Sequence, residues 1–175
     1  MNVDDCINLD DLRVLAKKRV PKLIYDFIEG GSEDESGLVR NEDAFRQRAL
    51  VPRYMVDITA INQDTELFGR TYSSAYGIAP TGGISNYRHQ GDLMLARAAR
   101  DANIPFIMSG AATARMEDMA RECPDHGWYQ LYTAKDRSIS EDQIKRAQEL
   151  GIKTLVITVD VPASGNRERN KRNGF

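Results

Sequence analysis

The chain has 175 residues, of which 41% are hydrophobic, and this is enough to bury one sizeable core. Its 24 Lys and Arg residues nearly balance 26 Asp and Glu residues, so no basic field points to nucleic acid or to an anionic membrane. Cys6 and Cys123 lie far apart and outside any metal-ligand spacing, which disfavours a disulfide framework or a zinc site and fits a reduced, cytoplasmic setting. We also expect no signal peptide and no membrane span, since no stretch reaches the roughly 18 apolar residues that a span needs.

The first fifty residues predict helices. One begins at Leu9, with Asn8 in front of it as a cap. A second has Pro21 as its first residue, carries an apolar stripe and ends at Gly30-Gly31. A third, more charged helix spans about 33–48. After them, Thr65–Phe68 and Arg70–Tyr72 flank Gly69 like a small hairpin.

Beyond the hairpin, short strands and helices alternate. The expected strands are Gly77–Ala79, Pro105–Met108, Trp128–Leu131 and Thr154–Val159, and the expected helices are Asp92–Ala102, Ala114–Glu122 and Ile139–Leu150. The last strand is apolar and β-branched, as expected for a parallel strand covered on both faces. This order predicts an α/β fold with four βα units, either a doubly wound sheet or a part of a (βα)8 barrel. A complete barrel needs about 250 residues, so only half of one fits here.

Polar groups gather at the end of each expected strand or directly after it. They are Pro80-Thr81-Gly82, Ser109-Gly110, Gln130 with Tyr132, and Thr158 with Asp160. The carboxyl ends of parallel strands share one face, so these groups are expected to converge on one pocket. Neutral donors and acceptors suit a heterocycle such as a flavin pyrimidine ring. Because no phosphate-binding glycine loop, acid pair or Ser-His-Asp set is present, redox chemistry supplied by a cofactor is the leading interpretation.

Four stretches resemble the signatures of one enzyme family: Pro21–Phe27, Ala79–Gly82, Trp128–Tyr132 and Thr158–Asp160. The family is that of the FMN-dependent 2-hydroxy-acid oxidases and dehydrogenases, which includes glycolate oxidase, L-lactate dehydrogenase and (S)-mandelate dehydrogenase. The resemblance implies a (βα)8 TIM barrel with an N-terminal helical extension. Residues 1–72 would cap the barrel, and residues 73–175 would form its first half, ending after strand 4.

The resemblance also implies roles for individual residues. The backbone of Pro80, Thr81 and Gly82 would lie along the reactive edge of FMN, and Ser109, Gln130 and Thr158 would hydrogen-bond its pyrimidine ring. Tyr25 and Arg167 would hold the substrate carboxylate, a role that suits the bidentate guanidinium. Tyr132 would bond the substrate hydroxyl, and Asp160 would pair with a catalytic histidine.

That histidine is not matched in this sequence. His89 and His126 lie at other positions, and for both we expect a solvated structural role. The family's histidine stands late in the barrel, so this segment alone is expected to be inactive and to need the remaining half of the barrel as its partner. By the same resemblance the protein would be a homotetramer, with oxygen or a quinone as electron acceptor, located in the cytosol or peripherally at the inner face of a membrane.

Two small residues bear on the substrate. Gly82 stands where many oxidases of the family have alanine, and Ala111 where glycolate oxidase has a bulky tryptophan, so an aromatic 2-hydroxy acid such as mandelate is favoured. Two other interpretations stay open, a different FMN- or phosphate-binding barrel enzyme and a non-catalytic half-barrel assembly module. The basic run 166–172 is expected to be a solvated face or a phosphate-binding patch, and not a nucleic-acid site.

Overall fold

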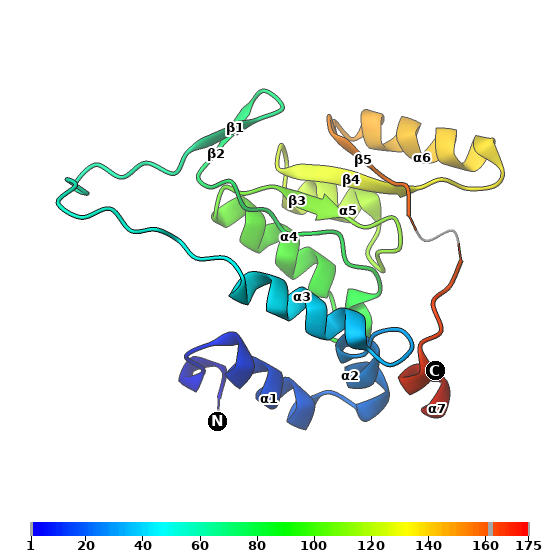
Figure 1. The fold of residues 1–175 in the computed structure, drawn as a ribbon. Coiled ribbons are helices and arrows are strands. Elements are labelled where there is room, and N and C mark those ends of the chain that lie inside the picture. The colour runs from blue at the N-terminus through cyan, green and yellow to red at the C-terminus, as the bar shows by residue number, and fades with distance from the viewer. Residues whose placement is uncertain (1, 161–162, 175) are drawn as a thin grey trace. The chain divides into compact units, whose positions relative to one another are not determined.

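The structure, a computed structural model, describes residues 2–160 and 163–174, and it divides into two compact units (Figure 1). Unit 1 consists of Met1–Val56 with Val161–Phe175, and unit 2 of Asp57–Asp160. From the sequence we expect a different division, between residues 72 and 73, in which the first segment caps a barrel. That division stays a prediction.

Unit 1 is helical. Its elements are the short 3-10 helix η1 (Val3–Asp5) and the α-helices α1 (Leu9–Arg19), α2 (Lys22–Glu29), α3 (Ser36–Arg46) and α7 (Glu168–Arg172). The predicted cap of α1 is confirmed, because the Asn8 side chain accepts a hydrogen bond from the Asp11 backbone N–H at 2.8 Å. α2 ends at Glu29 with Gly30 as its C-cap, so the predicted terminator is confirmed, but Pro21 is its N-cap and not its first helical residue.

α3 is shorter than expected at both ends. Glu33 and Glu35 have φ angles of 52° and 62°, in the left-handed region that a right-handed helix excludes, so the helix begins only at Ser36. Helix α7 was not predicted, because a five-residue, mostly charged stretch has no apolar stripe to reveal it.

Unit 2 contains a hairpin and a parallel sheet with its helices. In the hairpin, β1 (Thr65–Leu67) pairs antiparallel with β2 (Arg70–Tyr72), as predicted. Its two-residue turn has positive φ at both Phe68 (51°) and Gly69 (78°), which matches the twist of a tight hairpin. The helical elements are η2 (Ile84–Asn86), α4 (Gly91–Asp101), α5 (Met116–Glu122) and α6 (Arg137–Glu149).

The parallel sheet has three strands in the order β3-β4-β5: β3 (Phe106–Met108), β4 (Gly127–Tyr132) and β5 (Leu155–Thr158). Each is joined to the next by a helix, which makes this an α/β fold. The expected strand Gly77–Ala79 appears only as an isolated parallel bridge between Ile78 and Phe106. Four complete βα units are therefore not confirmed, and no closed barrel is present among the described residues.

The core of unit 2 lies between the sheet and its helices. It contains Ala96 and Ala99 of α4, Met119 of α5, and Phe106 and Leu131 of the sheet, all nearly inaccessible. Burial of a large apolar side chain such as Met119, Phe106 or Leu131 stabilises the fold by roughly 1.5–3 kcal/mol.

β5 departs from the expectation of a strand covered on both faces. Leu155, Ile157 and the following Val159 are 38%, 52% and 92% exposed. Among the described residues β5 pairs only with β4, so it forms an edge of the sheet and one of its faces is uncovered.

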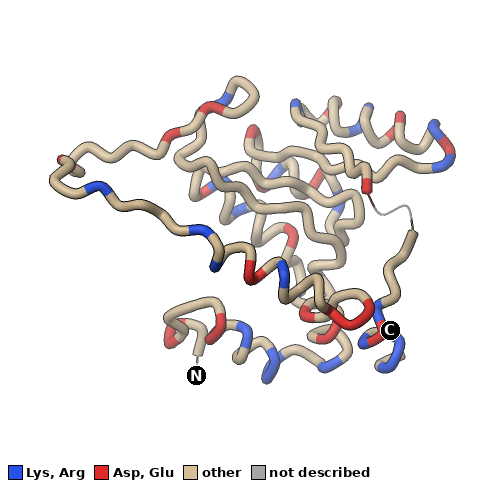
Figure 2. The backbone as a smooth tube through the Cα atoms, viewed as in Figure 1, with Lys and Arg blue, Asp and Glu red and all other residues tan. Residues whose placement is uncertain are grey.

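Acidic and basic residues are interspersed along most of the chain, with basic residues gathered in α7 (Figure 2). None of the described helices has the length and apolar character needed to cross a bilayer.

Candidate functional site

A hydrogen-bond network around Gln130 connects the carboxyl ends of the three parallel strands. The Gln130 side chain is only 1% exposed. Its Oε1 accepts from the Gly110 backbone N–H at 2.9 Å and from the Ser109 hydroxyl at 3.3 Å. Its Nε2 donates to Oγ1 of Thr158 at 2.7 Å, which leaves the Thr158 hydroxyl proton for another acceptor. Three of the predicted cofactor residues are thus in one network.

The loop after β3 lies close against β4. A Cβ atom added to Gly110 would stand 2.8 Å from the carbonyl oxygen of Gln130, so a residue with a side chain cannot occupy this position without a shift. The Ser109 hydroxyl also accepts from the backbone N–H of Ala111 at 3.1 Å. The loop is therefore held by short-range bonds at the point where it borders the strand ends.

The residues after Ile78 meet this same loop. The Gly83 backbone N–H donates to the carbonyl oxygen of Ala111 at 3.1 Å, and a Cβ on Gly82 would lie 3.1 Å from the Ala111 Cβ. Pro80 and Thr81 are exposed, so their backbone is open to a ligand. The structure thus brings the expected first-strand loop beside Ala111.

Tyr132 is the last residue of β4, and Asp160 lies two residues after the end of β5. Tyr132 is 49% exposed and Asp160 is exposed as well, which leaves both accessible to a ligand. All the predicted residues of unit 2 are thereby placed at one end of its sheet or in the adjoining loops.

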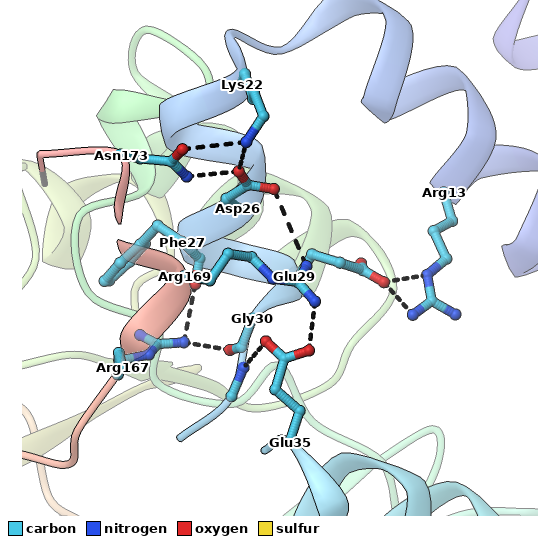
Figure 3. A network of polar contacts seen from close by, with 11 residues as sticks. Arg13, Lys22, Asp26, Phe27, Glu29, Gly30, Glu35, Arg167, Arg169 and Asn173 are labelled. Atoms are coloured by element: carbon cyan, nitrogen blue, oxygen red, sulfur yellow. Dashed lines mark hydrogen bonds and ion pairs between the residues drawn. The ribbon is translucent and has the colours of Figure 1, made fainter. Parts of the chain in front are cut away.

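Tyr25 and Arg167, the other two predicted site residues, belong to unit 1. Tyr25 is half-buried on α2. Arg167 precedes α7 and donates from Nη2 to the backbone oxygens of Phe27, at 2.9 Å, and of Gly30 (Figure 3). Its guanidinium carbon lies 4.8 Å from the centroid of the Phe27 ring. Arg167 is therefore not freely solvated, whereas Lys171 and Arg172 of the same basic run are exposed as expected.

Asp26 is a buried residue of unit 1 that the apolar stripe of α2 did not reveal. It accepts hydrogen bonds from Lys22, one helical turn away, and from the Asn173 side-chain amide (Figure 3). The Lys22 hydrogen bond, together with that from Asn173, holds the pKa of Asp26 below its ordinary value against the opposing effect of burial. The Lys22–Asp26 spacing of four residues was the available signal.

His126 corrects the expectation of a solvated histidine. It is buried, with Nε2 2.8 Å from Nη2 of Arg70 and Nδ1 2.9 Å from the carbonyl oxygen of Pro124. His89 is exposed, as expected. His126 stands directly before the first residue of β4, and its partners Arg70, Asn103 and Pro124 give it a structural role.

The donor set at the strand ends fits a flavin. It consists of neutral hydroxyl, amide and backbone groups, and the described residues contain no cluster of His, Cys, Asp and Glu able to hold a metal ion. Burial raises the pKa of the Cys123 thiol to about 11, which excludes it as a thiolate nucleophile at neutral pH. The hydroxyl, amide and backbone groups of the Gln130 network can hold a neutral heterocycle, and none of the network's side chains is an acid or a base.

An α/β fold whose strand ends carry such groups is that of a cofactor-binding protein. The family model described as FMN-dependent dehydrogenase matches residues 16–175, and the chain belongs to this family. The resemblance found in the sequence is thereby confirmed, and so is FMN as the cofactor of the family.

Curated relatives agree with this assignment. The chain is 42% identical to (S)-mandelate dehydrogenase of Pseudomonas putida over 96% of its own length and 42% of the relative. It is 40% identical to a peroxisomal (S)-2-hydroxy-acid oxidase of Oryza sativa subsp. indica, covering 95% of the chain and 46% of the relative. With L-lactate dehydrogenase of Vibrio parahaemolyticus the identity is 37%, and the shares are 94% and 44%. The chain thus spans less than half the length of these relatives.

Solved structures show the same fold. A soluble mutant of the membrane-associated (S)-mandelate dehydrogenase from Pseudomonas putida matches with a TM-score of 0.92 and 41% identity, over 99% of this chain and 49% of that one. A mandelate oxidase matches with a TM-score of 0.92 and 35% identity, over 97% of this chain and 51% of that one.

Proposed function

We propose that the protein containing this chain oxidises an L-2-hydroxy acid to the 2-oxo acid with FMN as the bound electron acceptor. The observation that carries the proposal is the Gln130 network, which holds neutral groups of β3, β4 and β5 together at the strand ends of a chain from an FMN-dependent family. The flavin supplies two-electron chemistry that the side chains alone cannot provide.

In this proposal the strand ends form one side of a flavin cradle. Ser109, Gln130 and Thr158 bond the pyrimidine ring, and the backbone of Pro80–Gly82 lies along the reactive edge. The mutual bonds of Gln130 and Thr158 support these roles, because side chains held before the ligand arrives lose little conformational entropy on binding.

Substrate-binding roles are part of the proposal. Tyr25 and Arg167 hold the carboxylate, and Tyr132 bonds the hydroxyl. Arg167 Nη2 already donates to two carbonyl oxygens, so in this proposal the remaining guanidinium N–H groups donate to the substrate carboxylate. Asp160 stabilises the protonated form of a histidine that takes the substrate proton and lies outside this sequence.

The wider architecture is part of the proposal. The described sheet is the first half of a (βα)8 barrel, residues 1–72 cap it, and the remaining half covers the exposed face of β5. By itself the segment is inactive. The complete protein assembles as a homotetramer, passes electrons to oxygen or a quinone, and works in the cytosol or at the inner face of a membrane.

An aromatic substrate such as mandelate is favoured by the small residues at the pocket. Gly82 and Ala111 face each other so closely that a Cβ on Gly82 would lie 3.1 Å from the Ala111 Cβ. That contact is tight, so Gly82→Ala must shift one of the two loops, and in this proposal the shift reduces the room for a substrate ring. We expect the ratio of kcat/KM for mandelate to that for glycolate to fall at least severalfold in this variant.

The test uses the full-length protein that contains this chain. It is purified, its flavin is released by heat and identified by mass, and its turnover of L-mandelate, L-lactate and glycolate is followed with an artificial electron acceptor. Bound FMN and turnover of L-2-hydroxy acids support the proposal, and equal or better turnover of glycolate overturns the aromatic preference. Bound FMN without any hydroxy-acid turnover would indicate a different barrel enzyme. A colourless protein that takes up no FMN would indicate an assembly module.

A further inference from the structure

Asp92 is a buried carboxylate outside the network described above. It lies in the first turn of α4 and is only 1% exposed. Among the described residues, no Lys, Arg or His nitrogen forms an ion pair with it. A buried carboxylate without a cation is costly unless hydrogen bonds satisfy it, so its partners must explain its presence.

The partners of Asp92 lie in the loop after β3. Oδ2 accepts from the Thr113 hydroxyl at 2.6 Å and from the Ala114 backbone N–H at 3.3 Å. The Thr113 hydroxyl has a single proton, and a carboxylate can only accept, so this proton is directed to Asp92. The charge on the acceptor makes this bond stronger than a neutral one.

Thr113 connects Asp92 to a second loop. Its oxygen lies 2.6 Å from the Ser85 hydroxyl oxygen and 3.3 Å from the Ser85 backbone nitrogen. Since the Thr113 proton is already directed to Asp92, Ser85 donates to Thr113. The result is a chain of hydrogen bonds from Ser85 through Thr113 to the buried carboxylate.

The two loops joined in this way border the candidate site. The first loop, residues 80–86, contains Gly82, and the second loop, residues 109–115, contains Ala111. They also meet at the Gly83–Ala111 backbone bond of 3.1 Å. A single backbone hydrogen bond would let the two loops rotate relative to each other. The second connection, between Ser85 and Thr113, fixes the distance between the loops.

We propose that Asp92 is a positioning residue, which through Thr113 and Ser85 fixes the first loop against the second and so sets the position of Gly82, packed beside Ala111, at the candidate site. The inference rests on the proposed function and deepens it, because it assigns the fit of the substrate to a residue that touches neither substrate nor flavin. In the proposed function this loop borders the substrate, and a small displacement of a group that positions the substrate lowers turnover strongly.

The experiment compares variants of the full-length, FMN-loaded protein. Asp92→Ala removes the acceptor, Asp92→Asn keeps one acceptor oxygen, and Thr113→Val removes the intermediate hydroxyl at nearly constant shape. Asp101→Ala on the same helix is the matched control, since its carboxylate is exposed and pairs with Arg100. The readouts are kcat and KM for mandelate and glycolate, and the visible circular dichroism of the flavin.

We expect Asp92→Ala to raise KM for mandelate about tenfold, with a smaller effect on KM for glycolate, and to change the flavin circular dichroism. Asp92→Asn should restore most of the loss, and Asp101→Ala should match the wild type. In a double-mutant cycle, Asp92→Ala should have little further effect once Thr113 is Val, because both act through one path.

Equal KM values and flavin spectra for Asp92→Ala and Asp101→Ala would overturn the inference, and so would additive effects of the Asp92 and Thr113 variants. If Asp92→Ala does not fold, Asp92→Asn and Thr113→Val are compared by the same readouts. A raised KM for mandelate in Thr113→Val with near wild-type values in Asp92→Asn supports the inference, and wild-type values in both variants overturn it. Wild-type protein that binds no FMN or oxidises no hydroxy acid overturns the proposed function instead, and that result is seen before any variant is made.

Discussion

The guanidinium carbon of Arg167 lies 4.8 Å from the centroid of the Phe27 ring, while its Nη2 donates to the Phe27 carbonyl oxygen at 2.9 Å. The last carbonyl groups of a helix have no partner within the helix. Arg167 supplies a hydrogen-bond donor for the Phe27 carbonyl oxygen at the end of α2. It also places a positive charge at the negative end of the helix dipole. A residue proposed to hold substrate thus has a second role in the fold of unit 1.

Replacing Arg167 with Lys tests this second role. Lys keeps the charge but has neither the planar fork nor the face that lies on the Phe27 ring. We expect a loss of stability of about 1–2 kcal/mol in the transition that reports unit 1, from weakened hydrogen bonds and the lost ring contact. Urea unfolding of the full-length protein measures it, with the exposed Arg48→Lys as control; identical midpoints for the two variants would contradict the role.

Gln130→Met tests the network at the strand ends. The variant keeps the volume but leaves the Gly110 N–H without its acceptor, at a cost of about 1–3 kcal/mol. We expect the dissociation constant for FMN to rise about tenfold or more, since each 1.4 kcal/mol corresponds to a factor of ten. Fluorescence titration of the apoprotein measures this, with the exposed Gln63→Met as control. FMN affinity equal to that of the control would show that the network does not hold the cofactor.

The lowered pKa of Asp26 predicts a loss of folding stability at acid pH. Its pKa is lowered in the folded state by the Lys22 hydrogen bond, so the carboxylate stabilises the fold fully above its unfolded pKa of about 3.9. That contribution is lost as the pH falls below this value through the folded pKa. We expect the stability difference between wild type and Asp26→Asn to be constant from about pH 6 to pH 5 and to decrease below about pH 4. A difference that stays unchanged down to pH 3 in urea unfolding would contradict the assignment.

Cys123 should resist alkylation. Burial raises its pKa to about 11, so little thiolate exists at pH 8, whereas Cys6 is partly exposed. We expect iodoacetamide to modify Cys6 in the native protein and to modify Cys123 only after denaturation, as read by peptide mass spectrometry. Labelling of Cys123 at the rate of Cys6 would show that the core around α5 opens readily.

Local patterns were enough to predict α1, the hairpin, β3, β4 and β5, and the gathering of polar residues at the strand ends. They could not show that Ile78 makes only a single bridge, because strand length depends on a partner strand and not on local preference. Nor could they show the burial of Asp26 and Asp92. Asn173 lies 147 residues from Asp26, and Thr113 lies 21 residues from Asp92, so only the tertiary structure supplies the partners that make burial of these carboxylates tolerable.

The uncovered side of β5 has a consequence for biosynthesis. Ribosomes add about 5–20 residues per second, so a chain that has reached Asp160 waits for seconds before much more of it emerges. During that interval the apolar residues at Leu155, Ile157 and Val159 can pair with the same strand of a neighbouring nascent chain on a polysome. Pairing between neighbouring chains at this edge would compete with folding of each chain.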